Sequence, residues 1–210
     1  LEESWITAYP LVQLGLLELA RHPLEAVPRT LEAAALLARR TNNVEPLRWA
    51  ECGLAERDLL LERHDQARAR LEPLLDRHGL EELDAIRPLA LLAWAHADDA
   101  AAARPLLARA TARAREQGMR PALALALWVR ALLEAHFGQT KAAAAALAES
   151  LALARAMPLP YAEGKALYLD GLHSRQRGDP ARAAAQLAAA LAVFAALGER
   201  MYASQAETAR

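Results

Sequence analysis

The sequence predicts an all-α protein built as a solenoid of antiparallel helical hairpins. Alanine (53 residues) and leucine (40 residues) supply 93 of the 210 positions, and both residue types favour helices. Valine, isoleucine and threonine, which favour β-strands, together number only 13. A motif that ends one helix and starts another also returns along the chain at intervals near 40 residues, which is typical of a repeat array.

The clearest copy of this motif is Gly178-Asp179-Pro180, which interrupts a stretch rich in alanine and leucine. Gly178 can adopt the left-handed conformation that closes a helix, and Asp179 can cap the next helix through its side-chain oxygen. Pro180 suits the first helical position, where its missing N–H has no helical partner to lose. The motif therefore predicts a tight turn between two antiparallel helices.

Related turns occur at four earlier places in the chain. Taking His22, His64, Asp98, Gly138 and Gly178 as marks, the successive spacings are 42, 34, 40 and 40 residues. We interpret each mark as the inner turn of one helix-turn-helix unit, and the near-constant spacing as reuse of that unit.

These turns divide a single domain, residues 1–210, into five units and a final helix. Pro28, Pro73 and Pro105 lie inside the second helices, so we expect bends or later helix starts there. Because the chain starts at Leu1 and stops within a helical stretch, we expect it to be part of a longer protein. The predicted units are 5–40 (helices 5–21 and 24–40), 45–78 (45–62 and 66–78), 84–117 (84–97 and 100–117), 121–156 (121–137 and 141–156) and 161–197 (161–177 and 180–197), followed by an extra helix over 199–210.

Small residues recur where the second helix of a unit should cross the first. Ala103, Ala143 and Ala183 each lie five residues after their turn marks, and a leucine follows one helical turn later. Small side chains let neighbouring helices approach to about 8–10 Å. Hairpins stacked in this way bury one continuous core, and we expect a curved row whose first and last helices do not meet.

This pattern of small residues resembles the tetratricopeptide repeat, which implies a right-handed superhelix. The chain departs from that repeat in its longer period, in Ser150 at the last small position of the fourth unit, and in Leu127 and Leu167 at a position that is usually aromatic. The matching positions are Gly171, Gly178, Ala183 and Ala190 in the fifth unit, Ala131, Gly138 and Ala143 in the fourth, and Ala103 and Ala110 in the third.

Longer segments, such as LGLLELARHPLEAV and GDPARAAAQLAAALAVFAALGER, look like the C-terminal arrays of bacterial signal-transduction ATPases. That family includes the maltose-regulator-like transcription activators and related nucleotide-cyclase fusions. The resemblance implies a sensor or interaction arm that works in signal transduction and transcription regulation. Its partner would be a protein or peptide, its own ATPase module, or a small effector. Cys52 is the only cysteine, so no intrachain disulfide can form, which fits a reducing compartment such as the cytoplasm. The sequence itself contains no GxxxxGK[ST] motif and no basic recognition helix.

Composition and spacing argue against several other classes of function. A formal net charge of −1 leaves no basic surplus for nucleic acid. No two of the six histidines lie three or four residues apart, as two metal ligands on one helix face would. Phosphate-binding loops, nucleophile elbows and catalytic triads are also missing from the sequence. We therefore expect no enzyme activity, no metal and no cofactor. We expect no membrane span either, since the least charged stretch, 183–197, is shorter than the roughly 18–20 residues required.

The first helices of the units are expected to line a concave groove that binds a partner. Trp128 and Tyr168 would supply large contact areas with few rotatable bonds, although Trp128 fits an inter-repeat core position equally well. We expect a monomer or weak self-association. The alternative function is a structural self-association module that stacks through its exposed repeat ends. The groove candidates are Trp128, His136, Tyr168, Lys165, Arg175, Gln176, Asp58 and Glu51.

Overall fold

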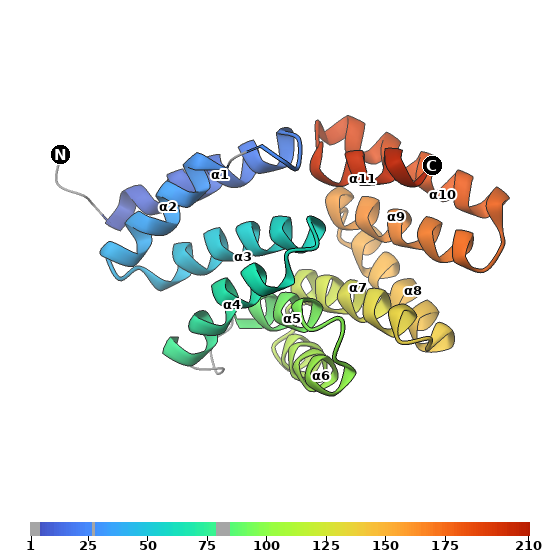
Figure 1. Ribbon diagram of the computed structural model, residues 1–210, viewed down its shortest axis with the longest axis horizontal. Helices are drawn as coiled ribbons and strands as arrows, with labels where there is room; N and C mark the ends of the chain where they lie inside the picture. The colour runs from blue at the N-terminus through green and yellow to red at the C-terminus, as the bar shows by residue number, and fades with distance from the viewer. Residues whose placement is uncertain (1–4, 27, 79–84) are drawn as a thin grey trace.

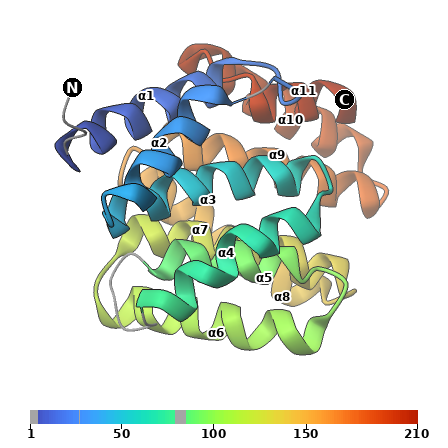
Figure 2. The same ribbon diagram turned by 60° about the vertical axis from the view of Figure 1, so that its left-hand side comes forward.

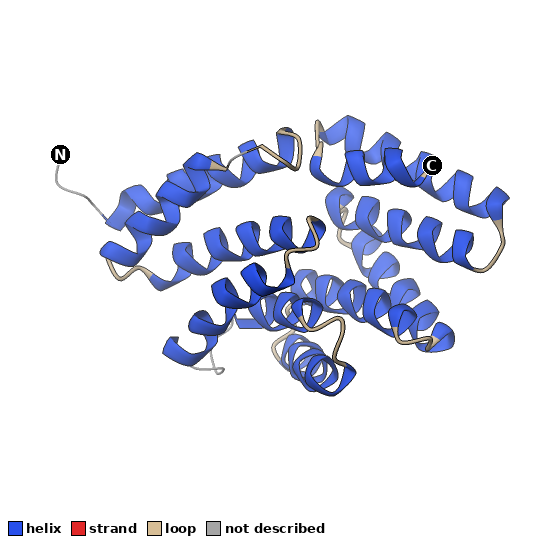
Figure 3. Ribbon diagram, viewed as in Figure 1, coloured by secondary structure: helices blue, strands red, loops and turns tan. Residues whose placement is uncertain are grey.

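A computed structural model describes residues 5–26, 28–78 and 85–210, apart from the side chains of Trp5 and of residues 76–78 (Figure 1). These ranges contain helices joined by short turns and no strand (Figure 3). The predicted start of the third unit, residue 84, lies outside them. The α-helices are α1 (Ala8–Arg21), α2 (Arg29–Arg40), α3 (Val44–Leu60), α4 (His64–His78), α5 (Ile86–Ala95), α6 (Ala100–Glu116), α7 (Arg120–His136), α8 (Thr140–Ala156), α9 (Pro160–Gln176), α10 (Pro180–Leu197) and α11 (Met201–Ala209).

Consecutive helices pack as hairpins, and the hairpins stack in chain order. The pairs α1/α2, α3/α4, α5/α6, α7/α8 and α9/α10 each make close contact, and every odd-numbered helix also packs against the next odd-numbered helix. Figure 2 shows the succession of hairpins from a second direction. The all-α solenoid of five hairpins and a terminal helix is therefore confirmed.

The turn chemistry accounts for the hairpin ends in the second half of the chain. Gly118, Gly138, Gly178 and Gly198 adopt positive φ values of 65°, 74°, 77° and 66°, which L-residues with a Cβ rarely take. The side chain of Asp179 accepts a hydrogen bond of 3.0 Å from the backbone N–H of Arg182. The helix break predicted at 178–180 is thus present, with α9 ending at residue 176 and α10 starting at residue 180.

The first hairpin departs from the predicted boundaries. Helix α2 begins at Arg29 instead of residue 24, because Pro28 has no backbone N–H to donate within a helix that started before it. The chain forms a turn at this point instead, in which the N–H of Ala26 donates to the carbonyl oxygen of Pro23 at 2.9 Å. Helices α4 and α6 continue through Pro73 and Pro105, so a later start is found only at α2.

Small residues stand at the helix crossings, as the spacing predicts. Ala103, Ala143 and Ala183 are all buried. At the crossing of α9 and α10, a Cβ placed on Gly171 would lie 2.7 Å from Cγ of Leu187, which is closer than real Cβ contacts. The absence of a side chain at Gly171 therefore allows α10 to pack directly on α9.

The first and last helices meet, so the prediction of an open row with separate ends is wrong. The backbone N–H of Arg200 donates to the carbonyl oxygen of Ala20 at 2.6 Å, and α11 packs against α1, α9 and α10. Figure 1 shows the end of α1 beside the start of α11. Helix α11 buries Met201, Tyr202 and Ala206 in this position. Burial of this apolar face gives a physical reason for the closure.

One helix in the described part of the chain, Pro180–Leu197, is long and apolar enough to cross a membrane by length and composition alone. It is α10, whose Ala183, Leu187, Ala190 and Phe194 are buried. A single helix of this kind is weak evidence for a membrane span.

Candidate functional site

A buried cluster of charged and aromatic side chains lies where the inner helices converge. Its central residue is Glu56 of α3, whose side chain is only 4% exposed. Oε1 of Glu56 accepts hydrogen bonds from Nζ of Lys165 on α9, at 2.5 Å, and from the hydroxyl of Tyr202 on α11, at 2.6 Å. Oε2 accepts a hydrogen bond of 3.0 Å from Nη2 of Arg87 on α5. One carboxylate therefore joins four helices, with partners up to 146 residues apart in sequence.

Three aromatic rings surround the ammonium group of Lys165. Its Nζ lies 4.2 Å from the ring centroid of Trp128, 4.8 Å from that of Tyr202 and 5.6 Å from that of Tyr161. The faces of aromatic rings attract cations within about 6 Å, and most strongly when the cation is desolvated. The indole N–H of Trp128 also donates to the backbone carbonyl of Lys165 at 2.9 Å, which fixes the ring relative to α9.

The charge on Glu56 is maintained by its neighbours. Burial alone would raise the pKa of this carboxyl group. The charges of Lys165 and Arg87, with the hydrogen bonds from Lys165 and Tyr202, outweigh burial and lower the pKa from 4.5 to about 2. Burial lowers the pKa of Lys165, against the opposing effect of Glu56. Glu56 is therefore ionised at neutral pH.

The two tyrosines of the cluster stay protonated at neutral pH. Burial, reinforced by the charge of Glu56, raises the pKa values of Tyr161 and Tyr202 well above 10. Glu199, which is also buried, accepts hydrogen bonds from the backbone N–H groups of Tyr202 and Ala203 at the start of α11. Burial raises the pKa of Glu199 in spite of these bonds.

A cavity of about 310 Å³ adjoins the cluster. Its charged lining residues are Glu56, Arg87 and Lys165, and its aromatic ones are Trp128 and Tyr161. The first turns of α7 and α9 supply much of the remaining wall, which is mainly apolar. The other lining residues are Pro121, Ala122, Ala124, Leu125, Ser150 and Ala162.

The eight groove candidates lie in several different environments in the structure. Lys165 and Trp128 belong to the buried cluster, and the half-buried Tyr168 packs its ring 6.2 Å from that of Tyr202. Arg175 is exposed and donates a hydrogen bond of 2.6 Å to the carbonyl oxygen of Ala209, at the end of α11. Lys165 and Trp128 also line the cavity beside Glu56.

Glu51 and Asp58 point toward the second helices instead of the concave side. Arg70 of α4 donates to Glu51 at 3.1 Å and to Asp58 at 2.8 Å. Arg39 of α2 donates to Glu51 at 2.5 Å. Both carboxylates are buried, and arginines balance their charges: Arg70 from the same hairpin, and Arg39 from the preceding hairpin.

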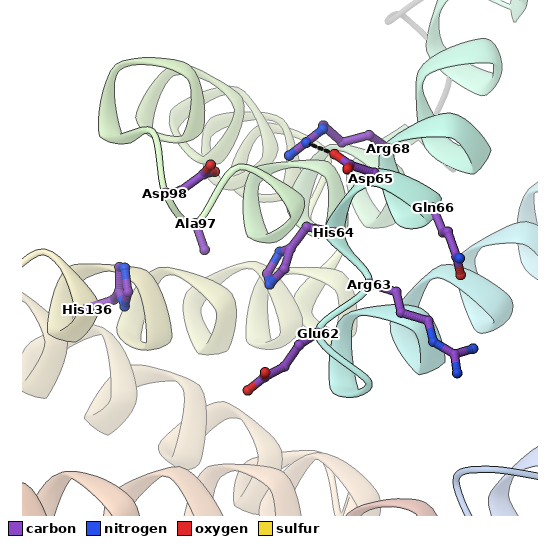
Figure 4. A pocket seen from close by; sticks show the side chains of 9 residues that line it. All are labelled: Glu62, Arg63, His64, Asp65, Gln66, Arg68, Ala97, Asp98 and His136. Atoms are coloured by element: carbon purple, nitrogen blue, oxygen red, sulfur yellow. Dashed lines mark hydrogen bonds and ion pairs between the residues drawn. The ribbon is translucent and has the colours of Figure 1, made fainter.

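The remaining candidates, His136 and Gln176, are exposed and line cavities at the other end of the inner helices. His136 borders a cavity of about 480 Å³ with Glu62, His64 and Asp98, and Figure 4 shows these side chains. His136 lies apart from His64 in this view. Charges of both signs line the cavity, and no group of three metal-binding side chains occurs in the described part of the chain. The cavity therefore favours no particular ligand.

Sequence reasoning missed Glu56, Arg87, Tyr161 and Tyr202. Helix α3 carried a usable signal, because it has no continuous polar face and places its charges among apolar residues. The pairing of Glu56 with Lys165 spans 109 residues and gives no local pattern. Tyr202 lies in α11, which the sequence analysis treated only as a terminal helix.

Neither a comparison with known protein families nor a search of curated protein sequences finds a match to this chain.

Proposed function

We propose that this protein is a non-catalytic binding scaffold whose inner cavity takes a small molecule. The observation that carries the proposal is the cavity of about 310 Å³ beside the Glu56 cluster, which lies at the low end of the size range of ligand pockets. Mainly apolar walls with a few convergent polar groups are the usual composition of such sites.

Helices of several repeats contribute to this cavity, so ligand binding there can change how the hairpins are arranged. Glu56 lies on α3, Arg87 on α5, Trp128 on α7 and Lys165 on α9. A ligand that contacts these side chains would stabilise one relative arrangement of the hairpins. We propose on this basis that the array acts as the sensor arm of a larger cytoplasmic bacterial regulator, with an ATPase module and a role in transcription.

A cavity-filling substitution tests the binding proposal. Ala122→Phe on α7 should occupy the cavity, whereas Ala108→Phe places the same side chain at an exposed position of α6 that lines a different cavity. Both variants are screened against one library of small molecules by thermal unfolding and titration calorimetry. We expect compounds that bind the wild type and Ala108→Phe but fail to bind Ala122→Phe. Hits that bind all three proteins equally would contradict the proposed site.

A second candidate function, self-association through a repeat end, is favoured by the exposed apolar side chains of the first hairpin. Of the six large hydrophobic residues exposed in the described part of the chain, four belong to this end: Ile6, Leu14, Leu17 and Leu36. They lie on the short 3-10 helix before α1, on α1 and on α2, and exposed apolar patches are typical of contact surfaces between proteins. Light scattering across a range of protein concentrations tests this function, with Leu36→Glu as the variant. A wild-type protein that stays monomeric at every concentration would exclude it.

A further inference from the structure

We propose that the cavity beside Glu56 binds a small organic monocarboxylate with an apolar body, held by Arg87 and Lys165. This inference rests on the proposed function and specifies the chemistry of its ligand. It follows from the charges that line the cavity, from the hydrogen-bond donors left over around Glu56, and from the composition of the walls.

The charged residues that line the cavity do not balance one another. Arg87 and Lys165 are cations, and Glu56 is the single carboxylate among the lining residues. Glu199, another carboxylate whose charge acts on Lys165, accepts hydrogen bonds from backbone N–H groups at the start of α11 and does not line the cavity. One bound monoanion would leave the lining residues and ligand together neutral.

Hydrogen-bond donors remain available on both cations. Arg87 donates to Glu56 through Nη2, and Lys165 donates to it through Nζ; the structure gives neither side chain another acceptor in the described residues. A guanidinium group carries five N–H donors and an ammonium group three. Glu56 already accepts three hydrogen bonds, one of them from Tyr202. A second carboxylate, supplied by a ligand, is the natural acceptor for the remaining donors.

The two cations differ in solvent exposure, as suits a ligand that enters the cavity from the solvent. The side chain of Arg87 is 34% exposed and that of Lys165 is 5% exposed. Arg87 therefore lies nearer the solvent, where it can meet an anion first. Lys165 is fixed among the rings of Trp128, Tyr161 and Tyr202, so its ammonium group is pre-organised for binding.

The rest of the lining selects against other classes of ligand. A sugar would need many hydrogen-bonding partners, but the hydroxyl of Ser150 already donates to the carbonyl of Ala124 at 2.8 Å. A cationic ligand would be repelled by Lys165, which occupies the aromatic cage itself. Apolar groups of Pro121, Ala122 and Leu125 instead suit the hydrocarbon part of an organic acid.

Ligand series on the wild-type protein give the most direct test. Benzoate, phenylacetate and hexanoate are titrated by calorimetry against the corresponding amides and amines at constant ionic strength. We expect at least one acid to bind with a Kd of about 1 mM or tighter. Its amide should bind about ten- to hundredfold more weakly, because it lacks the charge-assisted hydrogen bonds, and the amine should show no binding.

Two arginine variants then test whether the acid binds at Arg87. Arg87→Gln should weaken binding of that acid by about tenfold or more, while Glu56 keeps its bonds to Lys165 and Tyr202. Arg104→Gln is the matched control, since Arg104 pairs with Glu134 at 3.1 Å on the surface of a different cavity. Equal effects of the two substitutions would overturn the assignment to Arg87.

Failure of this inference can be told apart from failure of the proposed function. Amides or amines that bind as tightly as the acids, and that Ala122→Phe blocks, would overturn the carboxylate inference but support a small-molecule site. Absence of binding for all three acids at about 10 mM would overturn the inference. If the library screen against Ala122→Phe also finds no site-specific hit, the proposed function is contradicted as well.

Discussion

Helices α3 and α10 have similar lengths, 17 and 18 residues, but they bury different chemistry. Helix α10 buries apolar residues at the regular spacing of Ala183, Leu187 and Ala190, and no charged side chain. Helix α3 buries charges along much of its length, among them Glu51, Glu56 and Asp58. Helix α10 packs on its hairpin partner, whereas α3 contacts helices from other repeats on several sides.

This difference separates two sources of stability in the array. Hairpins are held by apolar packing between neighbours in sequence, and each contributes locally. The cluster around Glu56 is held by ion pairs and hydrogen bonds that connect distant repeats. Removing the partner of a buried charge lowers the free energy of unfolding strongly. Substitutions in the centre should therefore cost more than substitutions in a hairpin.

Removal of the charge on Glu56 should have the largest effect. Glu56→Gln leaves Arg87 and Lys165 without their buried carboxylate, which typically costs about 3–5 kcal/mol. Urea unfolding measures the change. Glu149→Gln is the control, because the exposed pair of Glu149 and Arg115 should contribute about 0.2–1 kcal/mol. Equal losses for the two variants would show that the centre is no more important than the surface.

Acid should destabilise the protein by slightly less than the Glu56→Gln substitution does. The pKa of Glu56 is about 2 in the folded protein and 4.5 ordinarily, so its stabilising effect is complete above pH 4.5 and is lost as the pH falls toward 2. That difference corresponds to about 3 kcal/mol. The raised pKa of Glu199 acts in the opposite direction, because Glu199 binds its proton more readily in the folded state.

Comparison of two proteins isolates the effect of Glu56 from that of Glu199. Unfolding free energies of the wild type and Glu56→Gln are measured across the acid range, with Lys165, Arg87, Tyr161, Tyr202 and Glu199 unchanged. We expect the stability difference between the two proteins to narrow as the pH falls below 4.5. A difference that is constant with pH would mean that folding does not shift the pKa of Glu56.

Overpacking of one hairpin should have a smaller effect. Ala183 is buried where α10 crosses α9, so Ala183→Leu should cost about 1–3 kcal/mol. Its neighbour Ala184 is exposed, and Ala184→Leu should change stability by no more than about 0.5 kcal/mol. Thermal and urea unfolding of the two variants provide the comparison. Similar stabilities would show that the register assigned to α10 is wrong.

The contrast between local hairpin packing and the long-range contacts of the central cluster also explains which features could be predicted from the sequence. The break between α9 and α10 depends on Gly178 and Asp179, whose conformational preferences act within a few residues. The burial of Ala183 follows from a spacing that returns in three units. Each of these features is local or periodic, so one sequence suffices to identify it.

Closure of the array and assembly of the site depend on distant partners. Ala20 and Arg200 meet only after all five hairpins have stacked, and the angle between successive hairpins is not encoded in any short motif. Lys165 was predicted to line the concave groove, whereas its burial against Glu56 depends on that closure. Trp128 is likewise buried, which favours the inter-repeat core position over an open groove.

Amide hydrogen exchange across α11 tests the central claim most directly, namely that α11 closes the array by docking on the buried charge cluster. In the wild type, α11 should be protected to a degree similar to α9. Tyr202→Phe removes only the hydroxyl that donates to Glu56, and should accelerate exchange in α11 by about tenfold or more while leaving α8 unchanged. Exchange of wild-type α11 at the rate of an unstructured peptide would contradict the account.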